Sequence, residues 1–358
     1  MERRQKLITG LNFKSDVIAE IGALCSPLVT KAEADVRFID YASAEVLRKH
    51  YSGNPGVDPD RIVETDAIWG EQTLFDALGQ RVDFILASHV IEHVPDLVTW
   101  LNELHSALND DGQVRLAIPD KRFTFDFLRR ESELSDVLAA YIASARIPQP
   151  QAILDYLLNA THVDHIAAWR GEVSKSTLQR PDSFASAMQK AGEAIKDGTY
   201  HDAHCWVFTP ESFATLLEQL SMHGLIKFSC DNFYDTEPDN IEFFVSLRTS
   251  NDVSEMAESW RQMAKSVRHS SPSSIASLER ELMSAIADAK KNDPRPGPEE
   301  DSLDEHQNFS LIEAELQRTR ESLERAVREI RLLKKSNSWR LTQPLRSMAG
   351  VFRQLKNN

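Results

Sequence analysis

The sequence is poor in cysteine. It has three in 358 residues, Cys25, Cys205 and Cys230, and no two of them are spaced as C-x-x-C. Disulfide-rich domains and zinc sites built from paired cysteines need more cysteines at closer spacing. The sequence therefore argues against a disulfide scaffold and a cysteine zinc site, and it fits a reducing cytoplasm.

Long apolar runs and an excess of basic residues are also missing. The amino-terminal segment lacks the apolar core of a signal peptide, and no stretch reaches the roughly 18 apolar residues of a membrane-spanning helix. With 41 Lys and Arg against 55 Asp and Glu, the formal net charge is −14, which argues against a nucleic-acid partner. We expect a cytoplasmic protein.

Short apolar runs alternate with helix-compatible segments over the first 120 residues. This alternation is typical of βαβ units and predicts an α/β fold with a parallel sheet. The predicted strands comprise residues 17–22, 36–40, 61–66, 82–89 and 112–120. The predicted helices between them comprise residues 42–50, 71–78 and 95–108.

Residues 123–200 depart from this alternation and are predicted to form a helical insertion. Apolar residues recur there at helical spacing in three segments. These segments comprise residues 132–145, 152–160 and 183–195. An amphipathic helix at 210–223 and a hairpin at 226–247 follow, and the globular domain, residues 1–248, is expected to end near Arg248.

The last hundred residues differ in composition. Residues 249–308 are polar and predict a linker with a short helix. Apolar residues alternate at spacings of three and four over 309–335, which predicts a coiled coil, with a single docked amphipathic helix as the alternative. Residues 336–358 are basic and amphipathic and include Trp339. Such a tail suits an anionic membrane surface or, equally, a docking site on another protein.

Polar residues and a glycine stand where the predicted strands end. In chain order they are Glu20, Gly22, Asp40, Asp66, Ser88 and His89. Glu92 and His93 follow one helical turn further along, where we expect supporting roles. The carboxyl ends of parallel strands meet at one edge of a sheet, which is where open α/β sheets bind ligands. The sequence therefore predicts a binding site at this edge.

This order of strand ends resembles the class I S-adenosylmethionine-dependent methyltransferases, over about residues 12–248. The segments EHV at 92–94 and LNDDGQVRLAIPD at 108–120 are similar to family motifs after the fourth strand and at the fifth. The resemblance implies a Rossmann-like seven-stranded sheet, S-adenosylmethionine as cofactor and methyl transfer as activity. It further implies that the six strand-end residues line the cofactor.

Asp40 is the strand-end residue with the clearest physical role. A carboxylate at the end of the second strand is suited to accept hydrogen bonds from two ribose hydroxyls, as in dinucleotide folds. Capping of the helix that follows is the alternative.

The first turn departs from the family pattern. Gly22 provides conformational freedom and close approach, but Ala23, Leu24 and Cys25 stand where further glycines are usual. A dinucleotide dehydrogenase needs those glycines to seat a pyrophosphate, so the sequence favours S-adenosylmethionine over NAD. An altered pocket also leaves open a catalytically inactive scaffold that acts through its coiled coil.

Histidines provide the candidate catalytic groups. His89 follows the fourth strand, and His201 and His204 belong to the segment HDAHCW; any of them could remove a proton from a hydroxyl acceptor. His162 and His165 form a second such pair. Although histidine pairs can also bind metal ions, isolated histidines are more often structural, and we predict no metal site.

The segments SHVIEHVPD and IPDKRFTFD are similar to methyltransferase-domain proteins of bacterial surface polysaccharide synthesis. The segment SNSWRLTQPLR, at residues 336–346, resembles the carboxyl termini of glycosyltransferases and related enzymes of O-antigen assembly. The resemblance implies a sugar or lipid-linked glycan acceptor at the inner face of the plasma membrane. The coiled coil would then mediate homo-oligomerisation or bind a glycosyltransferase partner.

Overall fold

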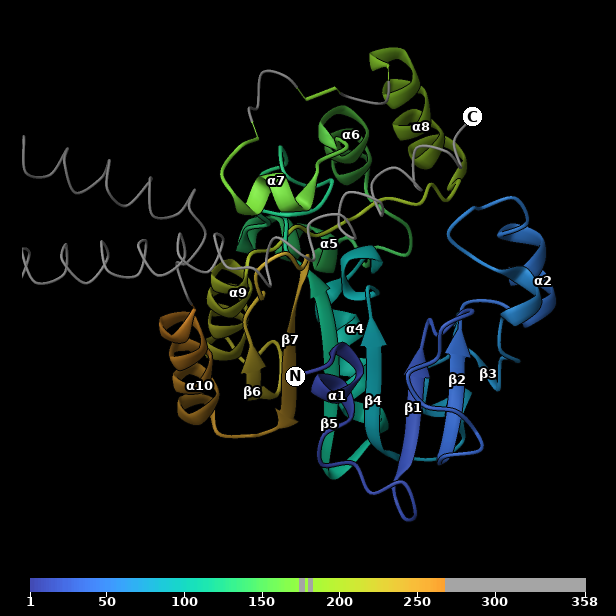
Figure 1. The fold of residues 1–358 in the computed structure, drawn as a ribbon, viewed down its shortest axis with the longest axis vertical. Coiled ribbons are helices and arrows are strands. Elements are labelled where there is room, and N and C mark those ends of the chain that lie inside the picture. Colours follow the sequence, from blue (N-terminus) through green and yellow to red (C-terminus); the bar gives the residue numbers. More distant parts are fainter. Residues whose placement is uncertain (174–177, 180–182, 268–358) are drawn as a thin grey trace, which may run out of the picture. The chain divides into compact units, whose positions relative to one another are not determined.

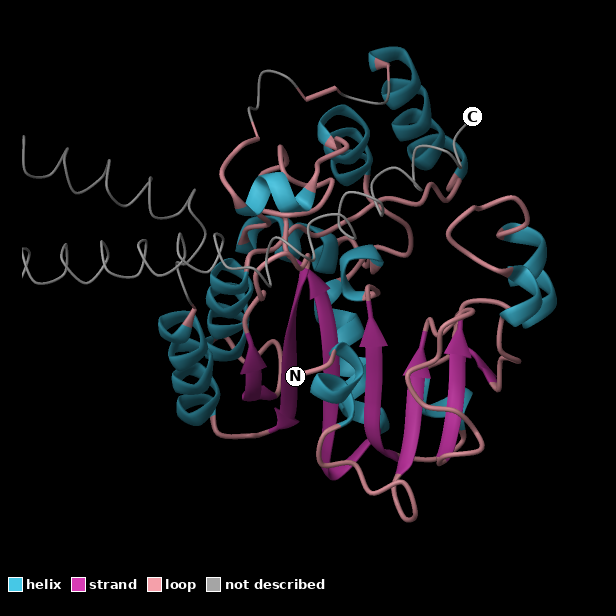
Figure 2. Ribbon diagram, in the orientation of Figure 1, coloured by secondary structure: helices cyan, strands magenta, loops and turns pink. Residues whose placement is uncertain are grey.

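The computed structural model describes residues 1–173, 178–179 and 183–267. The predicted coiled coil and basic tail lie outside these residues. The described chain forms a seven-stranded sheet in the order β3-β2-β1-β4-β5-β7-β6, with helices packed against it (Figures 1 and 2). β7 runs antiparallel to both of its neighbours, β5 and β6. The predicted α/β class and the terminal hairpin are confirmed.

The strands are β1 (Val17–Ile21), β2 (Asp35–Asp40), β3 (Ala67–Ile68), β4 (Val82–Ser88), β5 (Leu108–Pro119), β6 (Phe228–Tyr234) and β7 (Glu242–Thr249). The helices are α1 (Arg3–Ile8), α2 (Ala44–His50), α3 (Leu74–Leu78), α4 (Leu97–Ala107), α5 (Leu134–Ile142), α6 (Pro150–Asn159), α7 (His165–Trp169), α8 (Phe184–Asp197), α9 (Pro210–Met222) and α10 (Val253–Ser266). Two 3₁₀ turns are η1 (Pro59–Arg61) and η2 (Ile91–His93).

The prediction of a third strand at residues 61–66 is wrong. Residues 61–66 form part of η1 and an irregular segment, and β3 begins only at Ala67. The apolar side chain of Ile62, which suggested a strand, packs against Ala44 and Leu47 of α2 instead of joining the sheet. Asp66 therefore precedes the strand that it was predicted to follow.

Apolar side chains cover both faces of the sheet. Leu101 of α4 and Phe213 of α9 belong to the larger core cluster, and both are fully buried. On the opposite face, Leu7 of α1 packs in a second cluster with Ile18 of β1 and Leu86 of β4. β4 is thus buried on both sides, which explains its near-continuous apolar sequence.

The helical insertion is confirmed, and it consists of α5 to α8. The helices lie beyond the carboxyl ends of β4 and β5 (Figure 1). α6 and α8 pack against each other through a small cluster that includes Ile153, Leu157 and Ala191. The short helix α7 was not predicted. The insertion therefore stands over the sheet edge at which the ligand site is expected.

The predicted domain boundary at Arg248 is too early. α10 follows β7 and packs its buried Trp260 against the end of the sheet, where the indole N–H donates to the carbonyl of Phe228 at 2.8 Å. Because the outer face of α10 is charged, the mean hydropathy of this segment is low, and the segment was therefore predicted to be part of a linker. The domain extends at least to the end of α10.

Candidate active site

Asp40 lies at the carboxyl end of β2, beside the ends of β1 and β4. β1 pairs in parallel with both strands, so the three ends share one edge of the sheet. Among the described residues the Asp40 carboxylate accepts one hydrogen bond, from the backbone N–H of Tyr41 at 2.8 Å. Burial raises the pKa of Asp40 to about 6, against the lowering effect of that hydrogen bond. This carboxylate retains the capacity to accept hydrogen bonds from two ribose hydroxyls.

The turn after β1 brings the backbone close to its neighbours. Gly22 has φ +70°, and a Cβ there would lie 3.0 Å from Cγ2 of Val90, so a side chain is disfavoured on both counts. Leu24 follows with φ +45°, a left-handed conformation that usually selects glycine. The turn thus keeps a glycine-like backbone at a position where the sequence has leucine.

Glu20 holds this turn in place. Its carboxylate accepts the backbone N–H groups of Leu28 at 2.7 Å and Val29 at 3.2 Å, and the residue is 3% exposed. Burial raises the pKa of Glu20 to about 7, although the two hydrogen bonds lower it. Since both oxygens are engaged by the chain, the observed contacts support a positioning role, and cofactor contact by Glu20 stays a prediction.

Asp66 is likewise engaged within the chain. Its carboxylate pairs with Lys31 Nζ at 2.5 Å and accepts the backbone N–H of Phe38 at 2.8 Å. These contacts tie the segment before β3 to the middle of β2. The placement of Asp66 after a strand end was wrong, and its contact with a cofactor stays a prediction.

Ser88 ends β4 and His89 follows it, and both take part in a group of polar and ionic contacts that the sequence did not reveal. Arg3 of α1 donates to Ser88 Oγ at 2.6 Å and to both carboxylate oxygens of Glu242. His89 has φ +54°, and its Nε2 lies 2.8 Å from Glu242 and its Nδ1 3.6 Å from Glu92. Burial lowers the pKa of His89, but the hydrogen bond to Glu242 and the charges of both carboxylates raise it overall. His89 is therefore held between two acids.

The two histidines of HDAHCW separate. His201 lies near α8, with its Nε2 3.0 Å from Glu193 in a geometry unsuited to a hydrogen bond. His204 is 5% exposed, and its Nδ1 lies 2.6 Å from the Asp126 carboxylate, which Arg129 also contacts at 2.8 Å. The structure thus brings His204, but not His201, to the sheet edge.

His93 lies next to His204, although we expected only a supporting role for it from the sequence. The two rings stand edge to face with centroids 4.6 Å apart. Their segments are joined because the backbone N–H of Trp206 donates to the Glu92 carbonyl and its indole N–H donates to Val94. The sequence signal was present in Glu92-His93, but the separation of 111 residues between His93 and His204 hid the contact.

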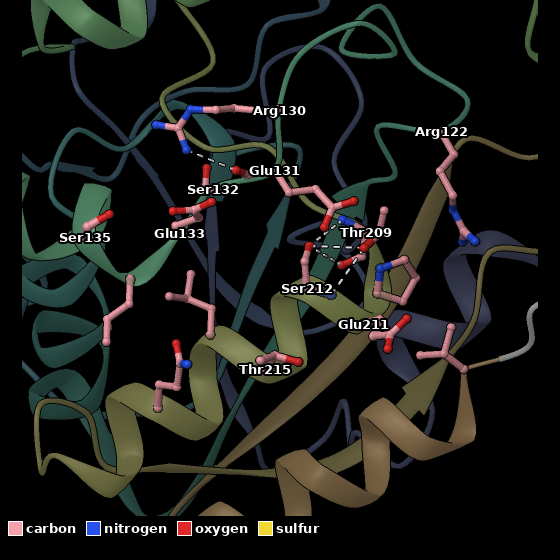
Figure 3. A pocket seen from close by; sticks show the side chains of 15 residues that line it. Arg122, Arg130, Glu131, Ser132, Glu133, Ser135, Thr209, Glu211, Ser212 and Thr215 are labelled. Atoms are coloured by element: carbon pink, nitrogen blue, oxygen red, sulfur yellow. Dashed lines mark hydrogen bonds between the residues drawn. The ribbon is translucent and has the colours of Figure 1, made fainter. Parts of the chain in front are cut away.

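Two hollows lie near this edge. The larger has a volume of about 790 Å³ and is lined by Arg122 and by residues at and near the amino-terminal ends of α5 and α9 (Figure 3). None of the predicted site residues lines it. Thr209 and Ser212 meet there to cap α9 (Figure 3). The smaller, about 270 Å³, is lined by residues of α5 and α6 and by Trp206. The smaller hollow adjoins the His204 segment, and so it is the one relevant to the strand-end site.

Residues 21–220 match the family model described as a methyltransferase domain. The chain belongs to the methyltransferase-domain family. The predicted enzyme class, an S-adenosylmethionine-dependent methyltransferase, is thereby confirmed. No curated protein matches the sequence.

Solved structures that resemble this methyltransferase do so at low identity. A complex of DhpI with SAH is 14% identical, covering 67% of this chain and 81% of that one, with a TM-score of 0.31. Magnesium protoporphyrin IX methyltransferase from Synechocystis PCC 6803 with bound SAM is 11% identical, covering 69% and 76%, with a TM-score of 0.30. A protein from Rhodobacter sphaeroides described as a Zn-dependent alcohol dehydrogenase is 13% identical, covering 69% and 88%, with a TM-score of 0.35. The family assignment rests on the match over residues 21–220 alone.

The residues of this methyltransferase fit its cofactor at two positions. Asp40 has acceptor capacity for ribose hydroxyls at the end of β2, and Gly22 lets the backbone approach a ligand closely. When bound, S-adenosylmethionine supplies an electrophilic methyl group on sulfur. What the chain must add is the position of an acceptor in line with that methyl group.

Proposed function

We propose that this methyltransferase methylates a hydroxyl of a sugar or lipid-linked glycan during cell-surface polysaccharide assembly. The observation that carries the proposal is the polar lining of the 270 Å³ hollow beneath the insertion. Asp136, Gln149, Gln151 and Asp155 line it together with the aromatic Trp206. Carboxylate and amide groups around an aromatic ring are suited to bind a small polyhydroxylated ligand.

The predicted catalytic histidines offer unequal support for this reaction. His89 is held between Glu92 and Glu242, and His201 stands apart beside α8. His204 immediately precedes Cys205 and Trp206, which line the hollow, and Asp126 fixes its ring. A hydroxyl acceptor gains from a group that takes its proton, and His204 is the predicted histidine best placed near that step.

Calorimetry with the full chain tests the cofactor part of the proposal. We expect heat of binding with S-adenosylmethionine and none with NAD, because the turn after β1 lacks the glycines that seat a pyrophosphate. Tight binding of NAD, or the absence of any heat of binding with S-adenosylmethionine, would contradict it. An acceptor screen over nucleotide sugars and short glycans with labelled methyl donor then tests the acceptor class, and labelling confined to non-sugar compounds would reject it.

A catalytically inactive scaffold is the second candidate. It is favoured by Leu24, which keeps a left-handed backbone where the family has glycine and so places a bulky side chain in the cofactor turn. Its partner would bind through the coiled coil predicted for residues 309–335. A homo-oligomer or a glycosyltransferase remains the proposed partner in both cases.

The basic tail is proposed to hold the enzyme at an anionic membrane surface. No helix in the described part of the chain has the length and apolar content to cross a bilayer. We expect the full chain to co-sediment with anionic liposomes, and a chain lacking residues 334–358 to stay in solution, because the removed segment carries six basic residues and no acid. Equal sedimentation of both chains would contradict the membrane role and favour a protein partner.

A further inference from the structure

Glu92 is a buried carboxylate without a hydrogen bond. The residue is 1% exposed, and neither carboxylate oxygen has a hydrogen-bond partner among the described residues. The imidazole of His89 is near, with its Nδ1 3.6 Å from the carboxylate. A buried, unsatisfied carboxylate is costly and calls for a further partner at the site.

Two imidazoles face this carboxylate. The ligand atoms of Glu92, His93 and His204 all lie within 4.8 Å of one another. The Nδ1 of His93 lies 2.9 Å from Asp202, and the Nδ1 of His204 lies 2.6 Å from Asp126. If each Nδ1–H donates to its carboxylate, each Nε2 presents a lone pair. Carboxylates that hold histidines in this way are the usual second layer of a metal site.

The backbone brings the three residues together independently of any ligand. The Glu92 carbonyl accepts the N–H groups of Cys205 at 2.6 Å and Trp206 at 3.2 Å. Asp126 is fixed in turn by Arg129, and both of these side chains are almost fully buried. The cluster is therefore anchored by the folded chain, which is what a preorganised binding site requires.

We propose that Glu92, His93 and His204 bind a divalent transition-metal ion. Two imidazoles and one carboxylate form a set that suits Zn²⁺, Fe²⁺, Mn²⁺ or Co²⁺ and leaves coordination positions open. Two metal–ligand bonds of about 2.1 Å span at most about 4.2 Å, so ligand atoms that lie 4.8 Å apart must approach each other by at least roughly 0.6 Å on binding. This site departs from the sequence-based prediction of no metal.

The open positions give the ion a role at the acceptor, and this step rests on the proposed function. An acceptor hydroxyl bound to the ion loses its proton more readily, and that proton passes to solvent, because His204 has no free nitrogen to accept it while it binds the ion. The oxygen lone pair then forms the O–CH₃ bond while the S–CH₃ bond breaks and its electrons stay on sulfur. The products are a methyl ether, S-adenosylhomocysteine and one proton.

Metal binding by the untagged full chain, freed of metal with a chelator, tests the site. We expect calorimetry with Zn²⁺ or Co²⁺ salts to give one ion per chain, and the Co²⁺ form to show ligand-field absorption. Glu92→Gln keeps the side-chain shape, and His93→Ala removes a half-exposed ring; each is expected to weaken binding more than tenfold. The control His223→Ala removes an exposed histidine at the end of α9 and should bind as the unaltered protein does.

The outcomes separate this site from the proposed function. Absence of binding in the unaltered protein, or unchanged affinity in a folded Glu92→Gln or His93→Ala variant, overturns the site. Methyl transfer that is insensitive to the chelator overturns its role at the acceptor. Metal binding that depends on Glu92, in a protein that labels no sugar, leaves the site standing and rejects the sugar acceptor.

Discussion

Asp40→Ala is expected to bind S-adenosylmethionine about 100-fold more weakly than the unaltered protein and to lose methyl transfer together with binding. Two hydrogen bonds from ribose hydroxyls to a carboxylate contribute about 3 kcal/mol together, which corresponds to a factor of about 100 in affinity. Calorimetry measures the first effect, and transfer of labelled methyl measures the second. The scaffold alternative fails if both are lost in the same variant.

The same carboxylate predicts a pH dependence. Burial raises the pKa of Asp40 to about 6, so the free protein holds a proton there at pH 5 and is ionised at pH 7. Because the carboxylate accepts the ribose bonds, affinity should fall as pH drops through 6, by about tenfold at pH 5. Asp40→Asn should remove this dependence.

Asp111→Ala is the matched control. Asp111 is an exposed acid near the amino end of β5, at the opposite edge of the sheet from Asp40. Its removal should leave affinity and the pH profile unchanged. Unchanged binding in Asp40→Ala, or an equal loss in both variants, would show that the ribose role of Asp40 is wrong.

Trp260→Ala is expected to lower the free energy of unfolding by about 3–5 kcal/mol, as for other buried tryptophans. Trp260 is fully buried, its indole N–H donates to the Phe228 carbonyl, and its ring meets Phe213 of α9 edge to face. The substitution leaves a cavity between α9, α10 and β6 and leaves a buried carbonyl without its donor. Urea denaturation of the full chain measures the change.

Met222→Ala is the comparison for that experiment. Met222 ends α9 and is 55% exposed, so its removal should change the free energy of unfolding by less than about 0.5 kcal/mol. A similarly small change in Trp260→Ala would mean that residues after Arg248 behave as the linker that the sequence predicted.

The parts of the fold that the sequence predicted are those set by local pattern. β4 is buried on both faces and shows as an apolar run, and Asp96 caps α4 through Thr99, one residue after the predicted start of the helix at residue 95. The strand predicted at residues 61–66 was wrong because a buried isoleucine has the same local pattern whether it packs in a sheet or against a helix. The periodicity of apolar residues indicates which positions are buried, but it does not indicate which neighbouring element buries them.

The site was predictable as a place but not as a set of contacts. Asp40 needed only its position at a strand end. The contact of Arg3 with Ser88 and Glu242 depends on how α1 lies across the sheet, and Glu92 meets His204 only after the insertion has returned to the sheet edge. Contacts between residues far apart in the chain leave no periodic signal, so spacing in the sequence could not reveal them.

The placement of the insertion has a consequence for how easily this enzyme can change its acceptor. Asp120, just after β5, and Phe208, just before α9, form a parallel bridge, so α5 to α8 together form one loop whose ends the sheet already holds. The entropy of closing a loop grows only logarithmically, and doubling its length costs about 0.6 kcal/mol. Insertion helices can therefore lengthen, shorten or be exchanged at little cost to the sheet, provided that the returning segment at His204 is retained. Acceptor choice would then diversify in the insertion while the donor side stays fixed.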